Sequence, residues 1–146
     1  MKLEDIQELW SSDSVIDDTE LDSESIKIPE IHNKYLKIFS DEKLRLVRLD
    51  SKSKELRRLK WLYYTGKLDE QTLKNLEWDV FDLDVKKNRH DLEMFLESDR
   101  DIIELNDKIE YQKEKINYLE TIIKSLSTRG FLIKNSIEWK KFIMGN

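Results

Sequence analysis

Hydrophobic positions recur at helical spacing over much of the chain. The pattern is clearest over residues 99–127, where apolar side chains follow one another at alternating steps of three and four residues. This stripe consists of Ile102, Leu105, Ile109, Gln112, Ile116, Leu119, Ile123 and Leu126, with Gln112 as its one polar member. Such heptad spacing predicts a long amphipathic helix with isoleucine and leucine along one seam.

Helical patterns also occupy the segments before this stripe. Residues 1–10 carry apolar side chains three residues apart, and residues 30–64 contain neither glycine nor proline, so we expect a short helix and then one long helix or two. Gly66 stands where a C-cap glycine would end that helix, and Gly130 is expected to end the heptad helix. The polar stretch 11–29 ends in a proline and predicts irregular chain.

Three shorter features have a less regular pattern. Residues 68–76 predict a short helix, and a last short helix is expected after Asn135 or Ser136. Ser98 and Asp101 stand in capping-box order before the heptad helix, with aspartate in place of the usual glutamate or glutamine. A partly alternating set is compatible with a short extended piece and consists of Trp78, Val80, Leu83 and Val85.

The composition favours an all-helical chain. Three glycines and one proline in 146 residues leave little material for the turns of an all-β fold. Charged residues (39 %) match apolar residues (38 %), which is usual for long, surface-rich helices or for subunits that complete their cores in an oligomer. We therefore predict an all-α bundle of long helices, divided into an N-terminal region, 1–97, and a C-terminal region, 98–146.

Charge is segregated along the sequence. The net charge is −5, yet residues 1–30 carry −8, residues 43–67 carry +7, residues 68–107 carry −8 and residues 108–146 carry +4. A whole-chain pI near 5.2 argues against a nucleic-acid partner, whereas a local charge of +7 attracts phosphates.

The basic segment is organised in its second half. At about 100° per residue, one helix face carries Lys54, Arg57, Arg58 and Trp61, with Tyr64 beside them and Lys60 at the border. Cations neutralise phosphates and an exposed aromatic ring can stack on an unpaired base, so this combination favours single strands over duplexes. The alternative is a solvated basic face, or one that pairs with the acidic segments of the same chain.

The heptad stripe likewise has two interpretations. It either packs inside a bundle formed by one chain or associates with copies of the chain. Beside it runs a second apolar stripe, which suits a ring or a larger bundle better than a simple dimer and consists of Tyr111, Tyr118 and Ile122. The residues expected to mediate assembly are Ile109, Ile116, Leu119, Ile123 and Leu126.

No pattern for catalysis or for a cofactor is present. The two histidines, His32 and His90, lie far apart in the sequence, and the chain has no cysteine. Gly66-Lys67 lacks the upstream glycine of a phosphate-binding loop. We therefore expect neither an enzyme nor a bound cofactor.

Metal and membrane binding are not expected either. Asp79, Asp82 and Asp84 lack the turn glycine and the glutamate of a calcium loop, so they predict a solvated acidic loop. No apolar run reaches the roughly 18 residues of a membrane span, and the acidic N-terminus is unlike a secretory signal. These features predict a cytoplasmic location.

Several short motifs occur in order along the chain. They are MKLEDIQE at 1–8, VIDDT at 15–19, RLKWLYYTGK at 58–67, DRDII at 99–103 and KSLSTRGFLIK at 124–134. Together they resemble the UvsY-type recombination mediator proteins of T4-like bacteriophages. The central motif is similar to that family's two basic residues flanking one position, followed by Leu-x-Tyr-Tyr-[Ser/Thr]-Gly-basic. The motif at 124–134 is similar to the family pattern only with a short insertion.

This resemblance implies a function and an assembly. It implies that the chain binds single-stranded DNA, helps to displace the phage single-strand-binding protein and loads a phage RecA-like recombinase in the cytoplasm of the infected bacterium. It also implies a ring-like homo-oligomer, a hexamer or heptamer, assembled through C-terminal helices. The family's DNA-binding basic pair corresponds to Arg58 and Lys60, here with arginine first. As a hypothesis separate from the resemblance, we expect Trp61 to strengthen base stacking.

We therefore expect a non-enzymatic recombination mediator, with DNA contacts in region 1–97 and assembly contacts in region 98–146. The expected DNA-binding residues are Lys54, Arg57, Arg58, Lys60, Trp61, Tyr64 and Lys67. The alternative is a helical oligomeric adaptor or scaffold that binds no DNA and pairs its basic helix with acidic protein surfaces.

Overall fold

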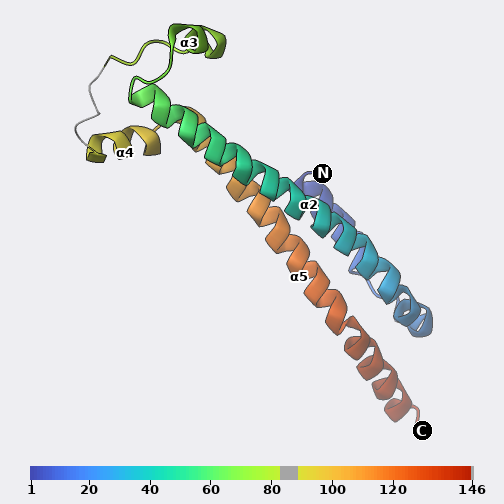
Figure 1. Ribbon diagram of the computed structural model, residues 1–146. Coiled ribbons are helices and arrows are strands. Elements are labelled where there is room, and N and C mark those ends of the chain that lie inside the picture. The colour runs from blue at the N-terminus through green and yellow to red at the C-terminus, as the bar shows by residue number, and fades with distance from the viewer. Residues whose placement is uncertain (83–88, 146) are drawn as a thin grey trace. The chain divides into compact units, whose positions relative to one another are not determined.

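The chain folds as a series of α-helices. The computed structural model describes residues 1–82 and 89–145, and within these ranges every regular element is helical, which confirms the all-α prediction. The predicted extended piece is not a strand over residues 78–82, and its other members, Leu83 and Val85, lie outside the described residues. The helices are α1 (Leu3–Asp13), α2 (Leu21–Tyr64), α3 (Glu70–Leu76), α4 (Arg89–Glu97) and α5 (Arg100–Ile143) (Figure 1).

Two compact units form within the chain. The first combines Met1–Arg45 with Gln112–Asn146, and the second is Leu46–Tyr111. The long helices α2 and α5 each contribute to both units. These two units are defined by which parts of the chain pack together. The predicted regions 1–97 and 98–146 divide the chain by function instead, and that division stays a prediction.

The core of the first unit is built from α1, α2 and α5. Its buried side chains are Ile6, Tyr35, Leu119, Ile122 and Leu126. Leu119 and Leu126 belong to the heptad stripe and Ile122 to the second stripe, so both stripes of α5 have partners inside the chain. Full burial of a large apolar side chain contributes about 1.5–3 kcal/mol, which makes this cluster the main source of stability here.

A buried polar cluster fixes the register of α2 and α5 in the first unit. Gln112 donates to the backbone carbonyl of Glu42 at 2.8 Å and to its carboxylate at 2.6 Å, and Lys115 pairs with the same carboxylate at 2.8 Å. Burial by itself would raise the pKa of Glu42, but the hydrogen bonds from Lys115 and Gln112 outweigh it and hold that pKa below its ordinary value. Because a buried charge without its partner is costly, a shift of register would destabilise the unit.

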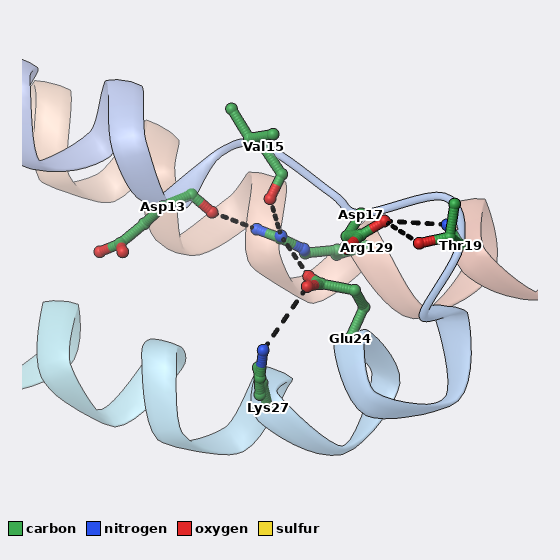
Figure 2. Close-up of polar contacts among 7 residues, drawn as sticks. All are labelled: Asp13, Val15, Asp17, Thr19, Glu24, Lys27 and Arg129. Carbon is green, nitrogen blue, oxygen red and sulfur yellow. Dashed lines mark hydrogen bonds and ion pairs between the residues drawn. The ribbon is translucent and has the colours of Figure 1, made fainter.

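Arg129 of α5 holds the connection between α1 and α2 in place. Figure 2 shows its guanidinium between the start of this connection and the first turns of α2. It donates to the backbone carbonyls of Asp13 at 2.7 Å and Val15 at 3.0 Å. It also pairs with the carboxylate of Glu24, on the first turn of α2, at 3.3 Å. One buried side chain therefore orders both ends of the connection.

The prediction of irregular chain over residues 11–29 is consequently wrong. Helix α1 continues to Asp13 and α2 begins at Leu21, which leaves a connection of residues 14–20 with hydrogen bonds of its own, from Thr19 to the Asp17 carboxylate (Figure 2). Helix α2 continues through Pro29, although an interior proline costs about 3 kcal/mol. The helix is held by packing on both sides of this proline, through Glu24 before it and Tyr35 after it.

The predicted end of the heptad helix at Gly130 is also wrong. Helix α5 runs from Arg100 to Ile143, so no separate helix begins at Asn135 or Ser136. The neighbouring side chains Arg129 and Ile133 are both buried, and this packing outweighs the roughly 1 kcal/mol that a glycine costs inside a helix.

The other helix ends follow local sequence signals. Asp99 caps α5 by accepting a hydrogen bond from the backbone N–H of Ile102 at 3.0 Å, so the predicted Ser98 cap is wrong by one residue. Gly66 follows the end of α2 as predicted, with a φ of 68° that other residues rarely adopt. The predicted short helix α3 is present and is capped by Asp69.

Candidate nucleic-acid interface

The basic face of α2 lies exposed in the second unit. Lys54, Arg57 and Arg58 are exposed, and together with Trp61 they line one groove of about 340 Å³, completed by Glu93 and Leu96 of α4. The spacing of three, four and seven residues from Lys54 places these side chains on one side of the helix, as predicted. The groove thus combines three cations with an indole ring.

Trp61 is 38 % exposed, so part of its ring is open for a base to stack on. Lys67 lies over this ring, with its Nζ 4.3 Å from the ring centroid. The chain turns at Gly66, whose positive φ allows Lys67 to return toward the last turns of α2. The structure therefore brings Lys67 to the predicted face, and it leaves one side of the indole in contact with a cation.

Lys60 does not lie at the border of the exposed face, and that part of the prediction is wrong. It is only 6 % exposed, and its ammonium pairs with Asp99 at 3.0 Å and with Asp101 at 2.7 Å. The same ammonium lies 4.0 Å from the centroid of the Trp78 ring. Two carboxylates and an aromatic ring from distant parts of the second unit cover this lysine, which helix phase alone could not reveal.

The electrostatics of this buried pair follow from its contacts. Burial favours a neutral lysine, but the hydrogen bonds to Asp101 and Asp99 outweigh it and raise the pKa of Lys60 above its ordinary value. Burial would also raise the pKa of Asp99, yet hydrogen bonds from Tyr64 and from the backbone of Ile102, together with Lys60, lower it overall. Both groups are therefore held in their charged forms.

Tyr64 is half-buried, and its contacts are with other residues of the second unit rather than with the basic face. Its hydroxyl donates to the Asp99 carboxylate at 2.6 Å, and its ring stacks on Phe95 with the centroids 5.6 Å apart. Phe81 packs edge-on against the same ring at 4.8 Å. Burial, followed by the bond to Asp99, raises the pKa of Tyr64 far above its ordinary value. Through Phe95 this tyrosine packs against α4, the helix that carries the groove residues Glu93 and Leu96.

Glu93 is a groove residue that the sequence reasoning missed. Its carboxylate accepts a hydrogen bond from the Arg57 guanidinium at 3.0 Å. No motif and no predicted helix includes Glu93, and its partner lies 36 residues away in the sequence. The strongly acidic charge of residues 68–107 was the one available signal, and it does not single out this residue.

The five residues expected to mediate assembly do not share one environment. Leu119 and Leu126 are buried in the core of the first unit, and Ile109 is buried in the second. Ile116 and Ile123 are partly exposed. Within one chain the stripe thus acts largely as core, which is the intramolecular alternative, and its part in assembly stays a prediction.

The C-terminal turns of α5 expose a different apolar surface, which we call the C-terminal apolar face. Trp139 and Phe142 are exposed and stack on each other with their centroids 5.7 Å apart. The same stretch of helix exposes further large apolar side chains, and the face consists of Phe131, Leu132, Trp139, Phe142 and Ile143. Several exposed large apolar side chains along one stretch of helix are typical of an interaction site.

Residues 1–82 and 89–145 contain no group of three or more acidic or histidine side chains placed to hold a metal ion. Within the same ranges no helix has the length and hydropathy needed to cross a membrane.

The fold and the groove together define a class, an all-helical protein whose basic, tryptophan-containing surface suits single-stranded nucleic acid. Comparison with known proteins identifies the family. Residues 9–146 match the family described as recombination, repair and ssDNA binding protein UvsY, so the chain belongs to the UvsY family. The resemblance found in the motifs is confirmed, and the chain is a recombination, repair and single-stranded-DNA-binding protein.

Individual relatives agree with this assignment. The chain is 25 % identical over 145 residues to the recombination protein UvsY of Enterobacteria phage T4, with 99 % of each chain covered. One crystal structure of the bacteriophage T4 recombination mediator protein UvsY matches with a TM-score of 0.83 at 24 % identity, covering 99 % of this chain and 98 % of that one. Another matches with a TM-score of 0.80 at 23 % identity, covering 97 % and 99 %. The fold is therefore shared along nearly the whole length.

Proposed function

We propose that this protein is a recombination mediator. It binds single-stranded DNA and promotes the loading of a phage RecA-like recombinase in place of the phage single-strand-binding protein. The observation that carries the proposal is the groove on α2, in which Lys54, Arg57 and Arg58 lie beside the exposed ring of Trp61. The T4 relative with the same fold is named a recombination mediator protein, which supports the same role here.

The groove would bind a strand through two kinds of contact. The guanidinium groups and the ammonium of Lys54 neutralise phosphates and release condensed counterions. The ring of Trp61 stacks on a base, with Lys67 on its other side as a further phosphate contact. Lys60 and Tyr64 contribute by holding the end of α2 and the start of α5 together, because both bind the Asp99 carboxylate. These are positioning roles.

Assembly would raise the affinity for DNA, because each groove alone would bind weakly. A groove with few cations binds one stretch of DNA weakly, but several grooves in a homo-oligomer bind one strand with a large gain in affinity. We propose a ring-like hexamer or heptamer in which the C-terminal apolar face contacts the neighbouring copy, with the partly exposed Ile116 and Ile123 as further contacts along α5. Repeated grooves would bend the strand into a form that one protein releases and another accepts.

The proposed setting is the cytoplasm of an infected bacterium, and the activity needs no catalysis. The mediator would contact three macromolecules: the strand, the recombinase and the single-strand-binding protein. The strongly acidic N-terminal residues 1–30 lie far along the chain from the groove and are a candidate surface for the protein partners.

Fluorescence anisotropy of a labelled oligothymidylate and of a matched duplex, titrated at several salt concentrations, tests DNA binding. We expect tighter binding to the single strand and a steep negative dependence on salt. Arg58→Ala should weaken binding and make the salt dependence shallower, whereas Arg45→Ala, an exposed control on the same helix outside the groove, should change both less. Absence of binding at low salt would favour the helical adaptor.

Sedimentation velocity tests assembly. Phe142→Asp should shift the protein toward smaller species, because it places a charge within the C-terminal apolar face. Ile26→Asp is the matched control, since Ile26 is also exposed and belongs to the same unit. An unchanged sedimentation coefficient for Phe142→Asp would exclude this face as the interface.

A further inference from the structure

One acidic side chain lies among the cations of the groove. Glu93 Oε2 accepts a hydrogen bond from Arg57 Nη2 at 3.0 Å, and the groove is otherwise lined by Lys54, Arg58, Trp61 and Leu96. A guanidinium binds carboxylate and phosphate oxygens through the same N–H donors. The Glu93 carboxylate therefore occupies a position that a phosphate of the strand would take.

Packing of α4 places this carboxylate. Leu96 is fully buried and Phe95 stacks on Tyr64, so both residues fix α4 within the second unit. Glu93 lies three residues before Leu96, and residues at that spacing lie on the same side of a helix. The side chain of Glu93 is thus directed to the groove by the buried residues of its own helix.

The ion pair between Arg57 and Glu93 is exposed enough for Arg57 to exchange its partner. The side chains of Arg57 and Glu93 are 51 % and 45 % exposed, in contrast to the buried pair of Lys60 and Asp99, at 7 % and 4 %. Exposed ion pairs contribute little to stability, so Arg57 can leave Glu93 for another anion without unfolding the unit. The buried pair does not have this freedom.

We propose that Glu93 competes with single-stranded DNA for Arg57 and so limits the affinity of the groove. This inference rests on the proposed function. When a strand enters, a phosphate replaces the carboxylate on Arg57, and when the strand leaves, the carboxylate returns. The exchange lowers the cost of release, which a protein that hands a strand to another protein requires.

The test is the affinity of the full-length protein for a labelled oligothymidylate, measured by anisotropy for wild type and Glu93→Gln. Glutamine keeps the size of the side chain and removes its charge. We expect binding to become tighter by about 1.5- to 5-fold for each groove engaged, which is the range set by losing an exposed ion pair. The slope of log affinity against log salt should stay nearly the same, because Arg57 contacts a phosphate in the bound state of both proteins.

Three comparisons separate this effect from a general change of charge. Glu97→Gln removes the same charge from an exposed position on the same helix, outside the described lining of the groove, and should tighten binding less. In an Arg57→Ala background, Glu93→Gln should lose its effect, since the competitor acts through Arg57. Glu93→Asp keeps the charge on a shorter side chain and should give an intermediate affinity.

The outcomes distinguish this inference from the proposed function. Wild-type binding that Glu93→Gln does not strengthen, or strengthens no more than Glu97→Gln, would overturn the role of Glu93 and leave the DNA-binding groove intact. An effect that persists without Arg57 would also overturn it. If neither wild type nor Glu93→Gln binds the strand at low salt, both proposals fail. Equal melting temperatures of the variants confirm that folded proteins are compared.

Discussion

Replacing Lys60 by alanine should destabilise the protein far more than replacing its neighbour Arg58. The two residues lie two positions apart in the central basic motif, yet Arg58 is exposed whereas Lys60 is 6 % exposed. The Lys60 ammonium pairs with Asp99 at 3.0 Å and with Asp101 at 2.7 Å. The substitution would leave the Asp99 carboxylate buried without its cation.

The magnitude follows from the surroundings of that carboxylate. Removing one partner of a buried ion pair costs about 3–5 kcal/mol. Asp99 keeps hydrogen bonds from the Tyr64 hydroxyl and from the backbone of Ile102, and the Asp101 side chain is 49 % exposed, so the loss should lie at the lower end of that range. We expect the free energy of unfolding to fall by about 3 kcal/mol for Lys60→Ala. For Arg58→Ala the change should stay within about 0.5 kcal/mol.

Urea unfolding followed by far-ultraviolet circular dichroism measures both values under identical conditions. Anisotropy titrations add a second readout. Under conditions where both variants are folded, Arg58→Ala should reduce the salt slope of binding by about 0.7, as expected for a lost phosphate contact, whereas Lys60→Ala should leave the slope unchanged. Equal stability of the two variants would refute the reasoning, and so would a slope that falls with Lys60 but not with Arg58.

Four further predictions concern the core, the helix, the groove and acid stability. Leu119→Ala should lower the free energy of unfolding by about 2–5 kcal/mol, because this side chain is fully buried; a loss below about 1 kcal/mol in urea unfolding would contradict the core assignment. Gly130→Ala should raise the melting temperature, since the glycine lies inside α5 and an added Cβ would meet nothing within 4 Å; a lower melting temperature would contradict the continuous helix. Trp61→Ala should weaken binding of oligothymidylate by about 1–3 kcal/mol per stacked base, and unchanged affinity would exclude stacking. The folded pKa of Asp99 is lowered, so its contribution to stability is complete above its unfolded pKa of about 3.9 and is lost as the pH falls through the folded value. Urea midpoints of Asp99→Asn should therefore fall less steeply with decreasing pH than those of wild type, and parallel curves would contradict the pairing.

The sequence by itself determined the helices whose signals are local. The heptad stripe of residues 102–126 lies in one unbroken helix, and Gly66 follows α2 because a left-handed conformation there suits glycine. The phase of a helix also placed Lys54, Arg57 and Trp61 on one exposed face. These properties depend on neighbours within a few turns, so a sequence pattern contains them.

Only the tertiary structure decided what covers each helix face. Lys60 and Arg57 are both cations of the same helix. Carboxylates 39 and 41 residues away in the sequence cover Lys60, whereas a carboxylate 36 residues away pairs with the exposed Arg57. Pro29 and Gly130 would interrupt isolated helices, yet the contacts of Glu24 with Arg129, and the burial of Ile133, outweigh their local cost. Helix propensity and phase act over single residues and turns, whereas burial and charge pairing depend on segments that meet only after folding, and these larger energies prevail.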